Sequence, residues 1–136
     1  MQVASGPSGI FNASVAFVNG QWYHLALVRS GSVMTLYLNG VNVGSITNTT
    51  NFSLNGCIIG RLGTTAQYYF DGYISNIRLV KGTAVYTSNF VPPMSNLTAI
   101  TNTQLLTLQN STLLDNSTNA FSITNNNSVT FPAGTV

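Results

Sequence analysis

The chain has 136 residues, of which four are basic and two acidic, so its formal net charge is +2. Charged residues make up 4% of the sequence, against about a quarter in ordinary soluble proteins, and 17 asparagines and 17 threonines supply amides and hydroxyls in their place. The basic residues are scattered along the chain and form no cluster, which argues against a nucleic-acid partner.

A chain of this length buries enough apolar surface to fold as one domain over residues 1–136. We also expect no cofactor. The first residues lack the basic and apolar segments of a secretory signal. No apolar run approaches the membrane-spanning length of about 18 residues. We therefore expect neither a standard signal peptide nor membrane insertion.

The strongest local pattern lies in residues 21–46. Two apolar-rich runs, 22–28 and 33–38, are separated by a short Gly- and Ser-containing turn, and Asn39-Gly40 leads into a third run. Asn-Gly favours a two-residue type I′ turn because both residue types tolerate positive φ. The pattern predicts an antiparallel meander in which Met34, Leu36 and Leu38 face the core and the middle strand is half-buried.

More short strands are expected on both sides of a linker. Residues 10–46 should carry three or four strands, 54–61 another, and 68–81 a long strand or a bulged pair. Pro92-Pro93 opens a linker over residues 92–103, after which residues 105–131 are interpreted as three further strands. With no helical periodicity, the sequence predicts an all-β, two-sheet antiparallel β-sandwich or jelly roll. The predicted core includes Trp22, Leu25, Leu27, Met34, Leu36, Leu38, Ile59, Ile74 and Ile77.

Five segments occur in an order and spacing that indicate a family. They are Trp-Tyr-His-Leu-Ala-Leu-Val-Arg-Ser-Gly at 22–31, Leu-Tyr-Leu-Asn-Gly at 36–40, Ile-Ile-Gly at 58–60, Phe-Asp-Gly-Tyr-Ile-Ser-Asn-Ile-Arg-Leu at 70–79 and Asn-Phe-Val-Pro-Pro at 89–93. Together they resemble the concanavalin A-like lectin/glucanase superfamily, in particular the laminin G-like domains of phage and marine-virus structural proteins. The resemblance covers roughly residues 8–93 and implies a concanavalin A-like jelly-roll fold, which does not by itself fix a function.

The C-terminal segment 104–136 is out of place with respect to this resemblance. A similar segment normally begins a domain of the family, and residues 1–20 resemble the middle of one. Two explanations fit: a permuted or shortened sandwich closed by its own C-terminal strands, or strands that complete a neighbouring chain. The second explanation, together with the low net charge, favours a homo-oligomer.

The sequence has few of the residues that catalysis or metal binding requires. Paired-carboxylate catalysis needs two acids at one bond, but the chain has no Glu and only Asp71 and Asp115, which are far apart. The catalytic glutamates of glycosidases with the resembled fold therefore have no counterpart. Both aspartates are interpreted as turn formers, Asp71 before Gly72 and Asp115 in an Asx-type turn. With a single histidine, His24, we expect no metal site and no enzyme activity.

Two further side chains have structural interpretations. His24 is expected to be a buried or interface histidine with a satisfied hydrogen bond, and Cys57, in an apolar run, an inert buried thiol.

Carbohydrate recognition combines aromatic platforms with hydrogen-bonding side chains, and the segment 67–70, Gln-Tyr-Tyr-Phe, is the best candidate for it. The predicted glycan contacts are Gln67, Tyr68, Tyr69 and Tyr73.

The predicted function follows from the resemblance and the charge-poor surface. We expect a non-enzymatic virion structural protein, a capsid-decorating or tail-appendage component of a phage, located on the extracellular particle surface and contacting other virion proteins. The alternative is an extracellular carbohydrate-binding adhesion module that contacts a surface glycan.

Overall fold

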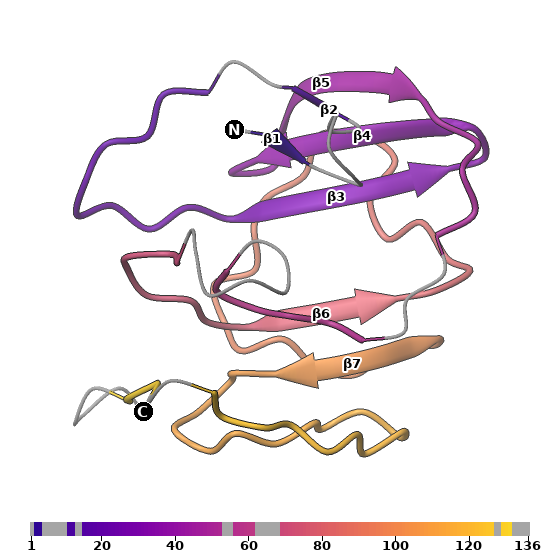
Figure 1. Ribbon diagram of the computed structural model, residues 1–136. Helices are drawn as coiled ribbons and strands as arrows, with labels where there is room; N and C mark the ends of the chain where they lie inside the picture. Colours follow the sequence, from indigo (N-terminus) through magenta and orange to yellow (C-terminus); the bar gives the residue numbers. More distant parts are fainter. Residues whose placement is uncertain are drawn as a thin grey trace. The chain divides into compact units, whose positions relative to one another are not determined.

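The computed structural model describes residues 2–3, 11–12, 15–52, 56–61, 69–126 and 129–131. Within these residues it contains strands and no helix (Figure 1). Every strand pairing is antiparallel, so the predicted all-β class is confirmed. The strands are β1 (Gln2–Val3), β2 (Phe11–Asn12), β3 (Leu25–Ser30), β4 (Val33–Leu38), β5 (Val41–Thr47), β6 (Ile77–Val80) and β7 (Thr103–Thr107).

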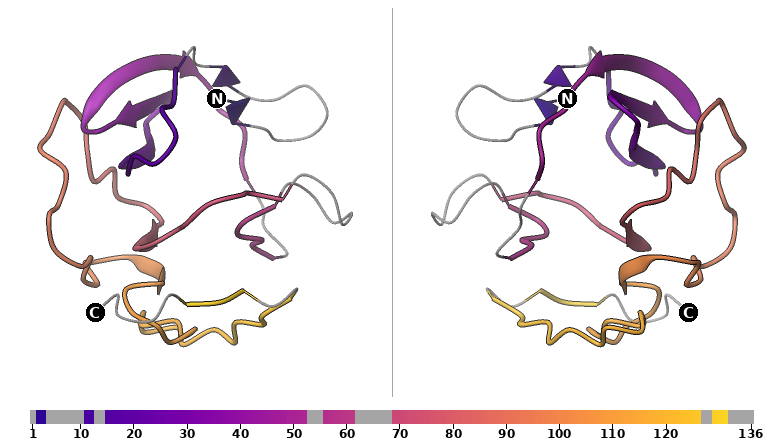
Figure 2. Two further views of the ribbon diagram at one scale, coloured as in Figure 1. Left: turned by 90° about the vertical axis from the view of Figure 1, so that its left-hand side faces the viewer. Right: turned by 90° about the vertical axis from the view of Figure 1, so that its right-hand side faces the viewer.

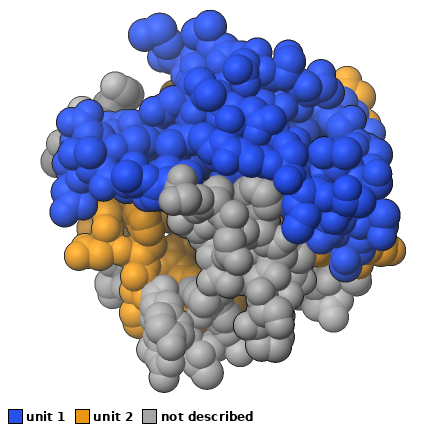
Figure 3. Space-filling view, turned by 90° about the horizontal axis from the view of Figure 1, so that it is seen from above, with its two compact units in different colours: residues 1–50, 82–94 blue, residues 51–81, 95–136 orange. Residues whose placement is uncertain are grey.

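The chain forms two compact units, each built from two separate segments (Figure 3). Unit 1 comprises residues 1–50 and 82–94, and unit 2 comprises residues 51–81 and 95–136. Unit 1 holds the β1–β2 pair and the three-stranded sheet β3-β4-β5, whereas unit 2 holds the β6–β7 pair.

The sheet of unit 1 is the predicted meander. Asn39 and Gly40 have φ angles of 48° and 79°, and Leu38 pairs directly with Val41, so the two-residue turn with positive φ at both positions is confirmed. The β4–β5 register shifts between Leu36 and Tyr37. Such a bulge increases the local twist, and the curvature of β5 is visible in Figure 2.

The core of unit 1 lies on β4. Leu36 is 1% exposed, and Val15 and Val43 pack against it. Tyr37, on the opposite face, is 3% exposed and meets the ring of Phe90 edge-on at 5.5 Å. Both faces of β4 are therefore covered, and the prediction of a half-buried strand was wrong because the sequence pattern gave no sign that residues 82–94 return to this sheet.

Several predicted core residues are exposed. Leu27 pairs with Leu36 across the sheet and therefore shares its face, yet it is 44% exposed because β3 is an outer strand of the sheet. For Leu27, the predicted face of the sheet was right and the predicted burial was wrong. Burial was also wrong for four other apolar side chains and for the thiol of Cys57, which is exposed; the four are Trp22, Leu25, Ile59 and Ile74.

Residues 82–94 are held on the β4–β5 turn by backbone and aromatic contacts. The Phe90 N–H donates to the Gly40 carbonyl at 2.9 Å, and the Asn42 N–H donates to Asn89 Oδ1 at 2.9 Å. The rings of Tyr86 and Phe90 stack with centroids 3.5 Å apart. These contacts explain how a loop without strands completes unit 1.

Within the described residues, the strands of unit 2 are fewer and shorter than predicted. β6 pairs with β7 of the same chain, with Arg78 opposite Leu106. Of residues 54–61, the described part contains only an isolated bridge between Arg61 and Tyr69, and residues 69–76 form no strand. Beyond β7, no further strand occurs in residues 108–126 and 129–131. Asparagine- and serine-mediated loops replace the expected strands because side-chain oxygens satisfy the backbone there.

The pairing of β7 with β6 bears on only the first residues of the C-terminal segment. The single-domain organisation, the linker over residues 92–103 and the closure of a sandwich by residues 104–136 stay predictions.

Candidate functional site

The predicted glycan-contacting residues lie in unit 2, and the structure describes two of the four. Gln67 and Tyr68 lie outside the described residues. Tyr69 and Tyr73 are both exposed, Tyr73 to 70%, and Phe70 between them is exposed as well. We define residues 69–73 as the aromatic segment.

Backbone pairing fixes the start of the aromatic segment. Arg61 and Tyr69 form an antiparallel bridge, and the Phe70 N–H donates to the Gly60 carbonyl at 2.8 Å. At Gly72 a Cβ atom would lie 3.0 Å from the Phe70 ring, so the ring closes over a backbone position that has no side chain. The segment therefore presents its aromatic rings from an anchored backbone.

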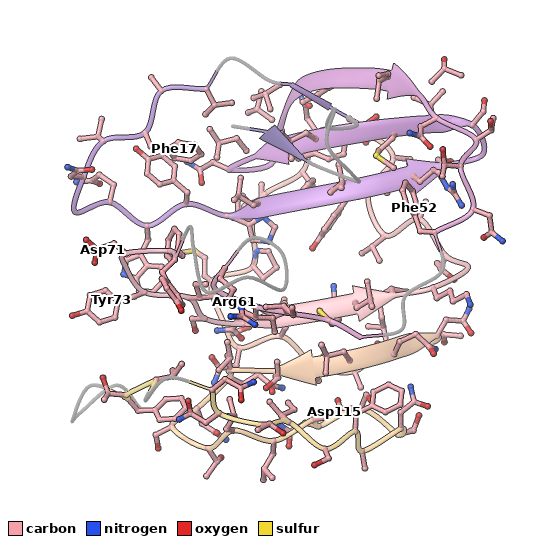
Figure 4. All side chains as sticks on the ribbon, viewed as in Figure 1. Phe17, Phe52, Arg61, Asp71, Tyr73 and Asp115 are labelled. Atoms are coloured by element: carbon pink, nitrogen blue, oxygen red, sulfur yellow. The ribbon has the colours of Figure 1, made fainter. Side chains whose placement is uncertain are left out.

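Asp71 lies in the middle of the aromatic segment with an exposed side chain. Its carboxylate makes no hydrogen bond or ion pair with any residue in the described part of the chain. The turn expected at Asp71-Gly72 rests on the backbone, which bends at Gly72, and not on this side chain. Asp71 and Tyr73 both point outward from the ribbon, and Arg61 is seen apart from them (Figure 4).

Asp115, by contrast, is fully engaged in a loop that folds back beside β7 (Figures 1 and 4). One carboxylate oxygen accepts from the N–H groups of Leu106 at 3.0 Å and Ser117 at 2.9 Å. The other oxygen accepts from the Ser117 hydroxyl and the Phe121 N–H, each at 2.9 Å. The bond to Ser117 N–H, two residues on, confirms the predicted Asx-type turn.

The hydrogen bonds also set the protonation of Asp115. Burial by itself raises the pKa of this carboxyl group, but the N–H groups of Ser117, Leu106 and Phe121 and the Ser117 hydroxyl together lower the pKa below its ordinary value of 3.8. Asp115 is therefore an ionised structural acceptor whose oxygens are already occupied. It is poorly suited to act as a general acid or a metal ligand.

His24 belongs to an aromatic group in unit 1. Its ring meets the Phe90 ring edge-on at 5.4 Å and the Tyr86 ring at 6.3 Å, and its backbone N–H donates to Asn39 Oδ1 at 2.9 Å. The sequence indicated a buried or interface position for His24 but not its neighbours, because Tyr86 and Phe90 lie outside any periodic strand. This group supports the fold of unit 1.

Unit 2 also has a shallow polar hollow of about 320 Å³, lined by residues 99–104 and Thr118. Asn102, in this lining, has a φ angle of 66°, and the Thr103 hydroxyl accepts from the Ile100 N–H. Its side chains are mainly hydroxyls and amides, which sequence reasoning did not single out. The hollow lacks the aromatic surface that a sugar ring would stack on.

Among the residues that the structure describes, no three His, Cys, Asp or Glu side chains gather in one place. The same residues include no helix with the length and apolarity needed to cross a membrane.

Comparison with known protein families identifies the superfamily of the chain. The description "Concanavalin A-like lectin/glucanases superfamily" matches residues 2–85, more than half of the sequence. The chain belongs to this superfamily. Membership agrees with the all-β antiparallel architecture and confirms the predicted concanavalin A-like β-sandwich class. Comparisons with curated proteins and with solved structures gave no match.

Proposed function

We propose that this lectin-like domain is a non-enzymatic virion structural protein, a capsid-decorating or tail-appendage component of a phage. The observation that carries the proposal is the surface: six charged residues in 136, combined with apolar side chains such as Val91 and Met94 that stand exposed. A surface with few charges and many exposed apolar groups suits a subunit that is covered by neighbours in a large assembly. The proposed partners are further copies of the chain and other proteins of the particle.

The non-enzymatic part of the proposal rests on the acids. No Glu is present, and the chain has only two Asp. Asp115 already accepts hydrogen bonds on both of its oxygens, which leaves Asp71 without a partner carboxylate for glycoside hydrolysis. Incubation with β-glucan, alginate and agar should release no reducing ends, and release that Asp71→Asn abolishes would contradict this part.

The virion role is tested by an inventory of purified particles. Mass spectrometry of density-purified phage from the source culture should detect the chain at a copy number comparable to that of known structural proteins. The chain should also sediment with intact particles after washing in high salt. Absence from purified particles, with the protein found in the particle-free supernatant, would contradict the proposal.

A second candidate function, carbohydrate binding in an extracellular adhesion module, is favoured by the aromatic segment. Tyr69, Phe70 and Tyr73 are large exposed side chains within five positions, and aromatic rings are the usual platforms for sugar faces. Binding of the isolated chain to a polysaccharide array, lost in Tyr73→Ala, would support this function. If the chain binds no polysaccharide on the array, carbohydrate binding is contradicted.

A further inference from the structure

The sequence contains three Asn-Gly pairs, at residues 19–20, 39–40 and 55–56. An asparagine before glycine is especially prone to spontaneous deamidation, because the glycine has no side chain to hinder its own backbone nitrogen. Asn55 lies outside the described residues, but the first two pairs are described and both belong to unit 1. The structure holds these two pairs very differently.

Asn19 and Gly20 form the tip of a turn that is held at its base. The Val18 N–H donates to the Tyr23 hydroxyl at 2.8 Å, and the Phe17 and Tyr23 rings meet edge-on at 5.0 Å. Asn19 and Gly20 themselves are exposed, and neither makes a hydrogen bond with another described residue. Gly20 also has nothing within 4 Å of the point where a Cβ atom would stand. Backbone and side-chain angles can therefore change at this tip without breaking a contact.

Asn39 and Gly40, at the β4–β5 turn, are held from two sides. The Asn39 N–H donates to the His24 carbonyl at 2.8 Å, and Asn39 Oδ1 accepts from the His24 N–H at 2.9 Å. Gly40 is buried, and its carbonyl accepts from the Phe90 N–H at 2.9 Å. The side-chain amide of Asn39 is thus tied to His24, and it can turn toward the Gly40 nitrogen only when the β4–β5 turn opens.

Deamidation brings the backbone nitrogen of the glycine onto the side-chain amide of the asparagine. Hydroxide removes the proton from this nitrogen, which then attacks Cγ of the asparagine. The new N–Cγ bond closes a cyclic imide, while the Cγ–Nδ2 bond breaks and Nδ2 takes a proton from water and leaves as ammonia. Water then opens the imide. Cleavage of the N–Cγ bond gives aspartate, whereas cleavage of the original peptide bond gives isoaspartate.

We infer that Asn19 is a site of spontaneous deamidation and that Asn39, although also followed by glycine, is protected by its bonds to His24. The product carries a carboxylate at position 19, which lowers the formal net charge of +2 by one. The new charge arises beside the exposed apolar side chains of Phe17, Val18 and Trp22. Conversion of Asn19 therefore makes this turn acidic on a chain that has few other charges.

The test compares the two pairs in one sample of the full chain. The chain is incubated at mildly alkaline pH, and peptide mapping by mass spectrometry follows the conversion of each asparagine to aspartate and isoaspartate. We expect Asn19 to convert at least about tenfold faster than Asn39, since Asn39 reacts only through local opening of its turn. In urea sufficient to unfold the chain, the two rates should become similar, because the contacts that distinguish the pairs are then lost.

Asn19→Gln is the matched control, because glutamine keeps the amide but its longer side chain closes the corresponding imide far more slowly. The variant should lack the acidic form that arises at residue 19 on ion-exchange chromatography. It should also keep the melting temperature of the parent chain, since Asn19 is exposed and makes no hydrogen bond with another described residue. Equal rates at Asn19 and Asn39 in the folded chain, or an Asn19 that converts only in urea, would overturn the proposal.

Discussion

The carbonyl oxygen of Phe90 lies 1.8 Å from the point where a Cβ atom would stand on Gly40. Gly40 also has a φ angle of 79° and is buried, so no other residue fits without moving residues 89–92 off the β4–β5 turn. The turn and the returning segment thus depend on the absence of a single side chain.

Gly40→Ala should therefore lower the free energy of unfolding by more than about 2 kcal/mol, because left-handed strain adds to a backbone collision. Gly31→Ala is the control, since Gly31 has a φ angle of 59° but nothing within 4 Å of an added Cβ. It should cost only about 1–2 kcal/mol. Urea unfolding of both variants measures the difference, and equal costs would show that Phe90 does not pack on Gly40.

Leu36→Ala should cost about 2–5 kcal/mol, the range for removing a fully buried leucine and leaving a cavity. Leu27→Ala is the matched control, because Leu27 faces Leu36 across the strand pair but is half-exposed; its cost should be clearly smaller. Thermal and urea melts followed by tyrosine and tryptophan fluorescence report both. A smaller effect at Leu36 than at Leu27 would mean that the core lies elsewhere.

Asp115→Asn should destabilise the chain at neutral pH by about 1–3 kcal/mol, because an amide group would face backbone N–H donors that now meet a carboxylate. The pKa of Asp115 is lower in the folded chain than its ordinary value of 3.8. The ionised Asp115 carboxylate therefore contributes its full stabilisation at pH values above 3.8. This stabilisation is lost as the pH falls through the pKa of the folded chain.

The stability difference between the parent chain and Asp115→Asn should accordingly be constant from about pH 7 down to about pH 5 and shrink below about pH 4. Chemical unfolding at several pH values measures it. A difference that grows on acidification would contradict the sign of the pKa shift.

A chain truncated after residue 95 should aggregate or fail to melt cooperatively. The truncation removes β7, leaves the β6 backbone without its partner, and deletes Leu97 and Leu108, whose backbone groups bond to Asn76. Unpaired strand edges and uncovered apolar surface promote association. Size-exclusion chromatography and calorimetry of residues 1–95 provide the test; a soluble, cooperatively melting monomer would show that residues 96–136 are dispensable for the fold.

Calcium should be dispensable for stability, because Asp115 is saturated by protein donors and Asp71 is alone in the aromatic segment. EDTA should leave the melting temperature unchanged. A fall with chelator that calcium reverses, and magnesium does not, would reveal a site built from backbone and amide oxygens.

The local features that short-range chemistry controls could be predicted from the sequence. The Asn39-Gly40 turn, the meander around it and the Asx turn at Asp115 each depend on residues within a few positions of one another. Faces were predictable for the same reason, as the pairing of Leu27 with Leu36 shows.

Burial and the extent of strands were harder, because they depend on which distant segment lies against a strand. Tyr37 is buried by Phe90, which lies 53 positions further along the chain. The loop after β7 is held by side-chain acceptors where alternating residues suggested strands. In the candidate site, Tyr69 and Tyr73 could be chosen from the aromatic segment of the sequence, and their contact with a glycan stays a prediction. The open state of Asp71 was not, because only the fold shows which acid finds donors.

The interleaving of the two units has a consequence for how the protein is made and cut. The chain leaves unit 1 after residue 50, returns at residue 82 and leaves again after residue 94. During synthesis, the ribosome must therefore deliver most of the chain before unit 1 has all of its parts, and unit 2 must wait for residues beyond 95. No single proteolytic cut can release either unit intact, so a nicked chain would keep its pieces together through non-covalent contacts alone.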